Sequence, residues 1–339
     1  MNYQHAFHAG NFADVHKHVV LTRILDYLRQ KPAPFRVIDT HAGAGRYDLE
    51  GPQATRSGEW RNGIGRVFEM RQSGATAPPT GAATEAAAAL LAPYLDIVAA
   101  LNPQHTLRLY PGSPLIIKAM LRRQDRLIAC ELEPGAAASL TASLRGDARA
   151  KALTIDGWMA LFANIPPKER RGLVLIDPSY EESADYARLA DALAQAYRKW
   201  PTGLYLLWYP IKSTENTALS EAPAAVPPDG YRRRKLNRPS RREGADALAR
   251  RLHRARIPQL LRERADALVR RLRRARIPKL LRCELSIGPA RAEGGLTGSG
   301  LIIVNPPFPL ERELRVILPA LVRLLAPTGA SRLDWLSGE

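Results

Sequence analysis

Two short stretches, far apart in the chain, combine residue types that could transfer a group onto a planar amine. Residues 39–45 read Asp-Thr-His-Ala-Gly-Ala-Gly and follow a mostly apolar run, 35–38. Residues 177–180 read Asp-Pro-Ser-Tyr and follow the apolar run 173–176. Because glycine lets the backbone turn sharply and approach a ligand closely, Gly43 and its neighbours predict a cofactor-binding loop after a buried strand.

The second stretch contains the acceptors that an amine needs before it can be alkylated. Both N–H bonds of a planar amino group must be held so that the nitrogen lone pair faces the donor carbon, and the Asp177 carboxylate and Pro178 carbonyl could hold them. Pro178 also stiffens the turn, and Tyr180 offers a ring on which an unstacked base can lie. The pattern predicts a pocket for the amino group of adenine or cytosine, with Asp177, Pro178 and Tyr180 as catalytic residues. An ordinary strand-ending turn is the alternative, since Asp, Pro and Ser are common turn residues.

The order of the predicted strands decides which of two Pro-containing corners is the site. Seven runs read as buried strands, mostly separated by helical patterns, which predicts a doubly wound α/β sheet. They cover residues 35–38, 126–130, 152–155, 173–176, 204–209, 280–287 and 301–304. Ligands bind such sheets beyond the carboxyl ends of central strands, where the strand order reverses, and the corner at 177–180 follows the fourth strand. The rival corner, Asn305-Pro-Pro-Phe308, follows the seventh strand, which with the sixth predicts an edge hairpin.

Acidic residues end two other predicted strands. Glu131 follows the second strand and could accept hydrogen bonds from ribose hydroxyls, as acids do in nucleoside-binding α/β folds. Asp156 and Gly157 follow the third, where a carboxylate could bind the amino group of a cofactor's adenine. Each position is also compatible with a helix cap. Their repetition at successive strand ends favours a binding site.

Several ligand classes are excluded or disfavoured. The dinucleotide fingerprint would need a third glycine where Asp48 stands, and the chain has no G-K-[ST] loop, so binding of nucleotide phosphates is disfavoured. Histidines are frequent near the N-terminus, but Cys130 and Cys283 form no C-x-x-C pair, and no metal is expected. No apolar run reaches membrane-spanning length and no secretory leader is seen, so neither a membrane span nor export is expected. Two cysteines agree with a reducing cytosol.

Four longer motifs add a family resemblance. They are His-Ala-Phe-His-Ala-Gly-Asn-Phe-Ala-Asp-Val-His-Lys-His at 5–18, the extended loop 39–47, Tyr-Pro-Gly-Ser-Pro-Leu at 110–115 and Leu-Leu-Trp-Tyr-Pro at 206–210. Together they closely resemble the RlmJ family, over about residues 1–212 and 280–339. The resemblance implies a Rossmann-like class I fold, S-adenosyl-L-methionine as cofactor, and methylation of N6 of adenine-2030 in 23S ribosomal RNA in the cytoplasm.

The resemblance also implies roles for single residues. The positions that match the family's cofactor contacts are His18, His41, Ser113, Glu131, Asp156, Gly157 and Asp177. Asp177 additionally matches the residue that handles the proton at the acceptor amine, and Tyr3 matches a tyrosine that contacts the RNA. The main departure is Ser179, where the family has proline, so the turn is loosened and its geometry is less constrained.

The basic character of the chain is local. Its net charge is +17, but residues 229–282 alone carry 20 Lys and Arg against 5 Asp and Glu, which leaves +2 for the remaining 285 residues. Inside this region, residues 243–262 are repeated by 263–282 with 16 of 20 positions identical. Each copy predicts a short helix that ends near a proline, either a solvated basic helix or an arm that binds RNA phosphates.

These observations predict one methyltransferase domain, 1–339. It contains a seven-stranded, mostly parallel sheet with a C-terminal β-hairpin, a helical insertion at 46–108 over the active face, and a basic linker with the duplicated helical insert at 213–282. The expected activity is transfer of methyl from S-adenosyl-L-methionine to adenine N6 in 23S rRNA. Two alternatives stay open: a DNA adenine-N6 methyltransferase, although no target-recognition domain is evident, and a catalytically silent RNA-binding relative, which Ser179 and the basic insert motivate.

Overall fold

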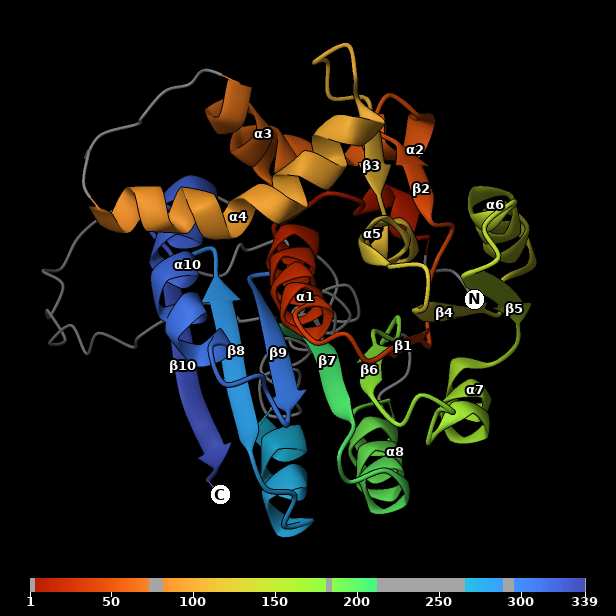
Figure 1. Ribbon diagram of the computed structural model, residues 1–339. Coiled ribbons are helices and arrows are strands. Elements are labelled where there is room, and N and C mark those ends of the chain that lie inside the picture. The colour runs from red at the N-terminus through yellow and green to blue at the C-terminus, as the bar shows by residue number, and fades with distance from the viewer. Residues whose placement is uncertain (1–3, 73–81, 181–184, 212–265, 289–295, 339) are drawn as a thin grey trace, which may run out of the picture.

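A computed structural model describes residues 4–72, 82–180, 185–211, 266–288 and 296–338 (Figure 1). Tyr3 and most of the predicted basic linker and insert, residues 213–265, lie outside the described residues. Within the described part, no helix is long and apolar enough to cross a membrane. The same residues contain no group of three or more His, Cys, Asp or Glu side chains arranged to hold a metal ion.

A central eight-stranded sheet organises the molecule, in the order β10-β8-β9-β7-β6-β1-β4-β5. Its strands are β1 (Arg36–Asp39), β4 (Arg126–Glu131), β5 (Ala150–Thr154), β6 (Gly172–Ile176), β7 (Leu204–Ile211), β8 (Leu280–Ser286), β9 (Gly298–Val304) and β10 (Ala330–Ser337). The pairs β1·β4, β1·β6, β4·β5 and β6·β7 are parallel. The pairs β7·β9, β8·β9 and β8·β10 are antiparallel.

The predicted seven strands all form, but the sheet has an eighth, and this corrects the position of the hairpin. β9 pairs with β7 on one side and with β8 on the other, so it is internal rather than at an edge. The outermost strand is β10, which is mostly exposed and therefore lacks the apolar run by which buried strands are recognised.

Two helical layers cover the sheet because successive strand residues point to opposite faces. In β6, Leu173 and Leu175 join one core, whereas Val174 and Ile176 join the other. The first core is covered by α1 (Phe12–Arg29), α5 (Ser113–Met120), α6 (Pro134–Leu144) and α10 (Leu310–Leu325). The second is covered by α7 (Gly157–Asn164), α8 (Asp185–Lys199) and the helical residues 266–274.

Helix α1 is the most buried of these, and it crosses the middle of the sheet (Figure 1). It begins where the Asn11 side chain accepts hydrogen bonds from the backbone N–H groups of Ala13 and Asp14, both at 3.0 Å. Buried side chains on a helix must either be apolar or find partners, and α1 carries several buried polar groups. Those groups contribute to the site described below.

The segment between β1 and α5 lies above α1 in Figure 1. It contains β2 (Arg46–Asp48), α2 (Pro52–Ser57), the 3-10 helix η2 (Glu59–Asn62), α3 (Ile64–Gln72), α4 (Ala82–Leu101) and β3 (Leu109–Pro111). A further 3-10 helix, η1 (His5–Phe7), contacts α2. β2 and β3 form a separate antiparallel pair, so the start of this segment is hydrogen-bonded to the strand that begins just beyond residue 108.

Candidate active site

The candidate site lies where the direction of the strand order reverses. The chain passes from β1 outward to β4 and β5, then returns to β6 on the other side of β1. The loops that follow β1 and β6 therefore diverge at the carboxyl edge of the sheet and leave room for a ligand. Both sequence stretches predicted to carry the chemistry, 39–45 and 177–180, follow these two adjacent strands.

The glycine loop is held against the end of β4 by Glu131. The Gly43 N–H donates to Glu131 Oε2 at 2.8 Å, while Oε1 accepts from the N–H groups of Leu132 and Glu133. Gly43 has φ +64°, and a Cβ there would lie 2.3 Å from the Tyr47 hydroxyl. The position therefore needs glycine both for its backbone conformation and for space.

Asp39, the last residue of β1, is a buried carboxylate that we did not predict as a site residue. Its Oδ2 accepts a hydrogen bond from Ser113 Oγ at 2.7 Å, at the start of α5. Its Oδ1 is buried and has no partner among the described residues. Burial and the nearby Asp177 raise the pKa of Asp39 to about 7, against a hydrogen bond from Ser113 that lowers it. A buried acceptor without a partner is costly, so this one marks a place for a ligand donor.

A cavity of about 150 Å³ opens beside these loops. It is lined by Thr40, His41, Glu131, Leu132, Asp156, Gly157, Trp158, Pro178, Ser179, Asp185 and Arg188. Predicted positions from four strand ends thus share one cavity, as their placement after successive parallel strands indicated.

His41 forms one wall of this cavity. Its Nδ1 is 2.8 Å from Thr40 Oγ1, and its ring meets the Trp158 ring edge-on with centroids 5.2 Å apart. Burial lowers the pKa of His41 to about 4, despite the carboxylates of Asp177 and Asp156 nearby. His41 is therefore a neutral, polar and aromatic wall at neutral pH.

Asp156 and Gly157 form the adjoining wall, and Asp156 is also a helix cap. Its Oδ1 accepts from the Met159 N–H at 2.9 Å at the start of α7, and Arg188 lies 3.8 Å from the same oxygen. A Cβ at Gly157 would lie 2.1 Å from the Thr40 carbonyl oxygen, so β1 and α7 meet there through glycine. Capping and ligand contact do not exclude each other, because a carboxylate can accept several hydrogen bonds.

The carboxylate of Asp177 is tied to helix α1 by Lys17, a second residue that the sequence did not single out. Lys17 Nζ donates to Asp177 Oδ2 and, at 2.9 Å, to Asp14 Oδ1. The Lys17 and Asp14 side chains are 5% and 3% exposed, so this ion pair is almost completely shielded from solvent. Burial alone would lower the pKa of Lys17, but the two carboxylates outweigh it and raise that pKa above its ordinary value.

Asp177 has one oxygen left. Among the described residues Oδ1 accepts no hydrogen bond, and the side chain is 15% exposed. Pro178, which follows, is buried and lines the cavity together with Ser179. Asp177, with its available acceptor oxygen, thus directly precedes two residues that line the cavity.

Tyr180 adopts a backbone conformation that is rare for a residue with a side chain, with φ +52°. Its hydroxyl donates to the Trp208 carbonyl, and its ring packs against Tyr186 and Trp208 with centroid distances of 4.7 and 5.7 Å. These contacts fix the ring next to the corner. Its predicted part in stacking a base stays a prediction.

His18 is brought less directly to the site than the other predicted residues. Its Nδ1 is 2.7 Å from the Tyr110 hydroxyl, and its ring lies against the rings of Tyr94 and Tyr110. Burial, together with the charge of Lys17, lowers the pKa of His18 to about 3. It neighbours Lys17 in α1, and its contact with a cofactor stays a prediction.

The rival corner at Asn305 lies at the opposite end of the strands, where the parallel strands begin. β9 runs antiparallel to β7, so the end of β9 meets the beginning of β7. Asn305 Nδ2 donates to the carbonyls of Pro201 and Gly203, both at 2.8 Å, and so holds the turn before β7. This structural use accounts for Asn305 without a ligand.

Known proteins share this architecture over nearly the whole chain. The Escherichia coli and Haemophilus influenzae proteins named ribosomal RNA large subunit methyltransferase J are 34% and 33% identical to it, each over the full length of both chains. A crystal structure of a Legionella pneumophila protein superposes with a TM-score of 0.74 at 31% identity, covering 98% of this chain and 99% of that one. The family model described as "Ribosomal RNA large subunit methyltransferase D, RlmJ" matches residues 32–221 and 242–337. The chain therefore belongs to the RlmJ family.

Proposed function

We propose that this protein transfers a methyl group from S-adenosyl-L-methionine to N6 of an adenine in 23S ribosomal RNA, in the cytoplasm. One observation carries the proposal: Asp177 Oδ1 accepts no hydrogen bond among the described residues, and the next residue, the buried Pro178, lines the cavity. Family membership supports it, because the relatives are named as methyltransferases of large-subunit ribosomal RNA.

The residues around the cavity fit this cofactor. Glu131 and Asp156 place carboxylates at two strand ends, suited to ribose hydroxyls and an adenine amine, and His41 and Trp158 supply aromatic walls. The partnerless Oδ1 of Asp39 would accept a hydrogen bond from the amino group of the cofactor's methionine portion. Gly43 lets the loop approach without a side chain in the way.

The protein's part in the reaction is to hold the acceptor amine. When bound, the cofactor supplies a methyl carbon on a sulfonium leaving group. Asp177 Oδ1 and the Pro178 carbonyl accept hydrogen bonds from the two N–H groups of the amine, which turns the nitrogen lone pair toward that carbon. Lys17 fixes the other carboxylate oxygen, so Asp177 is oriented before the substrate binds. Asp177 Oδ1 then takes the proton that the methylated nitrogen releases.

Replacement of Asp177 tests this assignment. Asp177→Ala should reduce formation of N6-methyladenosine in protein-free 23S RNA by more than tenfold, a barrier increase above about 1.4 kcal/mol, since it removes the orienting acceptor. Mass spectrometry of the digested RNA measures this, and thermal unfolding shows whether the variant is folded. Retention of more than a tenth of the rate would contradict the role of Asp177.

The matched control is a change at the rival corner. Asn305 has φ +52°, so Asn305→Gly removes the side chain without adding backbone strain. It should weaken the turn before β7 and leave the rate unchanged in folded protein. Loss of activity in the folded Asn305→Gly variant would indicate that the reaction takes place at the rival corner and not at Asp177.

The same assay separates the alternatives. Methyl transfer to duplex DNA in preference to RNA would identify a DNA adenine methyltransferase. Tight RNA binding with no transfer to any RNA would identify a silent relative, the reading that Ser179 motivates.

A further inference from the structure

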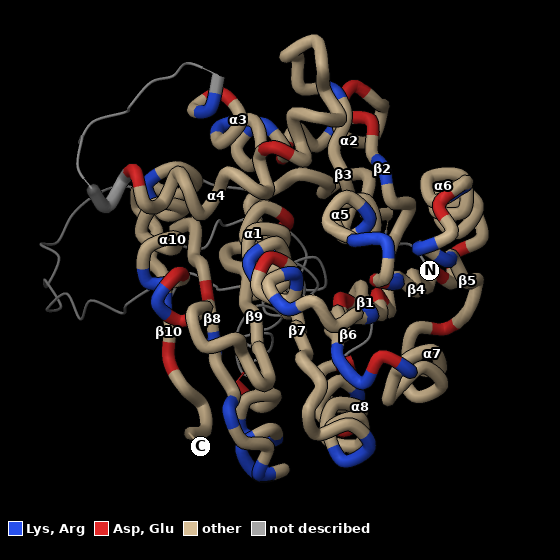
Figure 2. Tube along the Cα trace, viewed as in Figure 1, with Lys and Arg blue, Asp and Glu red and all other residues tan. Residues whose placement is uncertain are grey.

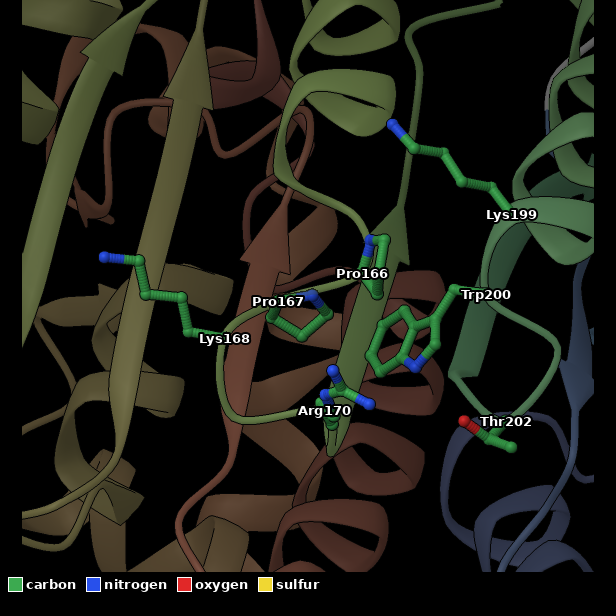
Figure 3. A pocket seen from close by; sticks show the side chains of 7 residues that line it. All are labelled: Pro166, Pro167, Lys168, Arg170, Lys199, Trp200 and Thr202. Atoms are coloured by element: carbon green, nitrogen blue, oxygen red, sulfur yellow. The ribbon is translucent and has the colours of Figure 1, made fainter.

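A hollow of about 540 Å³ lies at the opposite edge of the sheet from the candidate site (Figure 3). It is lined by Pro166, Pro167, Lys168, Arg170, Lys199, Trp200 and Thr202. Arg170 precedes β6 and Thr202 precedes β7, so the hollow opens where these strands begin. The corner at 177–180 follows β6, and the five residues of that strand separate it from the hollow by roughly 17 Å.

The hollow is strongly positive. Among the described residues no Asp or Glu carboxylate pairs with Lys168, Arg170 or Lys199. The nearest acid in sequence, Glu169, accepts hydrogen bonds from Arg36 Nε and Nη2, both at 2.9 Å. Lys199 donates to the Phe162 carbonyl at 2.6 Å, which leaves its charge uncompensated. An anion is the ligand that such a surface attracts.

Neutral donors accompany the charges. Trp200 is 3% exposed, and its indole N–H has no hydrogen-bond partner in the part of the chain that the structure describes. Figure 3 shows that N–H directed between the side chains of Arg170 and Thr202. A buried donor without an acceptor is rare in proteins, and here it faces a region lined by a guanidinium and a hydroxyl. This arrangement suits an oxyanion such as a phosphate.

An exposed aromatic ring extends the same edge. Asn305 binds the carbonyls of Pro201 and Gly203, so the loop that follows β9 lies beside the hollow. Phe308, in that loop, is 97% exposed. A phenyl ring so exposed contributes nothing to the core, but it can stack on a nucleic-acid base.

The basic surface continues from this loop to the arginines that precede β8. The Asn305 N–H donates to the Lys279 carbonyl at 3.1 Å, next to residues 266–276. The exposed cations of that segment are Arg270, Arg271, Arg273, Arg274 and Arg276. Figure 2 shows these Lys and Arg residues together at the lower edge, along with those at the end of α8.

We propose that this edge is a second RNA-binding surface, in which Lys168, Arg170 and Lys199 bind backbone phosphates and Phe308 stacks on a base. It rests on the proposed function in naming RNA as the polyanion. The contacts with phosphates carry no sequence information, so they would hold a long RNA while its target base lies at Asp177 across the sheet.

The test is a variant that removes the three cations. In Lys168→Ala/Arg170→Asn/Lys199→Ala, asparagine is chosen because residue 170 has φ +52°, a conformation that asparagine tolerates. Binding to protein-free 23S RNA is measured from low to moderate salt. The slope of log K against log salt should flatten by about 2 units, taking roughly 0.7 per lost contact. KM for this RNA should rise, while kcat at saturating RNA and cofactor affinity stay unchanged.

Phe308→Ala tests the stacking contact without risk to the fold, since the ring is exposed. It should weaken binding at least about fivefold. The matched control is Arg323→Ala, which removes an exposed arginine from the last turn of α10 and should change neither quantity.

Two outcomes would overturn the proposal. One is an unchanged salt slope in the triple variant together with unchanged affinity in Phe308→Ala. The other is an equal loss on a short hairpin RNA that contains the target adenine but cannot reach the far edge, since this would indicate general charge rather than a second site. RNA binding is measured without turnover, so a wild-type protein that transfers no methyl would contradict the proposed function and leave this test intact.

Discussion

At the scale of single residues, the site depends on Lys17, a cation whose burial the sequence does not reveal. Lys17 lies one turn after Asp14 in α1, a spacing that on most helices is a solvated ion pair worth little. Here both groups are buried, and Asp177 completes the network from the end of β6. Sequence alone offers no sign of this burial, because it arises when α1 packs against β9 and the neighbouring helices.

Replacing Lys17 should therefore cost stability as well as activity. Lys17→Met keeps the volume but removes the ammonium group from the buried Asp14 carboxylate, which is left with the His5 ring nitrogen and the Gly10 N–H, so the free energy of unfolding should fall by about 3 to 5 kcal/mol. Urea denaturation measures the loss. The double variant Asp14→Asn/Lys17→Met should recover much of it, since the buried charge is then gone. A loss below about 1 kcal/mol in the single variant would show that water reaches the network.

Replacement of Ser179, in the corner at 177–180, has a clear expected outcome. Tyr180 has φ +52°, and proline commonly precedes a positive-φ residue in a type II turn. Ser179→Pro should stabilise the protein by about 0.4 to 1 kcal/mol through the unfolded chain, and should maintain or raise the methylation rate. Thermal unfolding and the methylation assay check both. A folded variant with lost activity would show that this corner is built around the serine.

The sequence indicated some site residues and missed others for physical reasons. Gly43, Glu131, Asp156 and Gly157 come together because each follows a parallel strand, and the ends of parallel strands meet at one edge. Asp39 was passed over because its role depends on an oxygen that packing leaves without a partner, which no spacing reveals.

At the scale of elements, periodicity located the buried strands and failed at the exposed ones. β6 and β9 are buried along their whole length, and their apolar runs made them visible. β10 has one buried residue, Leu336, so nothing in its pattern distinguishes it from a loop. The strands β2 and β3 were missed because each is only three residues long, too short for a periodic pattern.

The duplicated insert allows a prediction about its two copies. In the second copy, Leu268 and Leu272 are 1% and 0% exposed and pack in the core below β7 and β8. Leu272→Ala should therefore lower the free energy of unfolding by about 2 to 5 kcal/mol, whereas the exposed Arg274→Ala should change it by less than about 0.5. Urea denaturation measures both changes.

The first copy, residues 243–262, lies outside the described residues. We predict that its deletion leaves a folded protein that binds the cofactor, because the second copy alone leads directly into β8. Isothermal titration with S-adenosyl-L-methionine checks this. A deletion protein that does not fold would show that both copies are required.

At the scale of the whole molecule, the buried histidines should make the fold sensitive to acid. Burial lowers the pKa of His16 and of His18 to about 3, and that of His41 to about 4, so the unfolded chain binds three protons near pH 5.5 that the folded protein does not. Asp39 acts in the opposite direction, since its raised pKa of about 7 lets the folded state hold one proton that the unfolded state releases.

The net uptake on unfolding is two protons between about pH 6.5 and 4. Stability should be full above pH 6.5 and fall by about 2 to 3 kcal/mol per pH unit below it. Urea titrations at pH 7.5, 6 and 5 measure the slope. Asp39→Asn removes the opposing proton and should steepen it. A flat profile from pH 7.5 to 5 would mean that the histidines protonate within the folded protein.

The packing of α1 against the last third of the chain has a consequence for synthesis on the ribosome. His16 contacts Cys283 at 3.2 Å and Ser299 at 3.0 Å, and Arg23 is bound by Glu313, so the helix that carries Lys17 is secured by residues made almost 300 positions later. Until those residues emerge, a nascent chain can form β1 to β7 but cannot fix Lys17 against Asp177. Contacts so distant in sequence form late, and the enzyme should become active only when its translation is nearly complete.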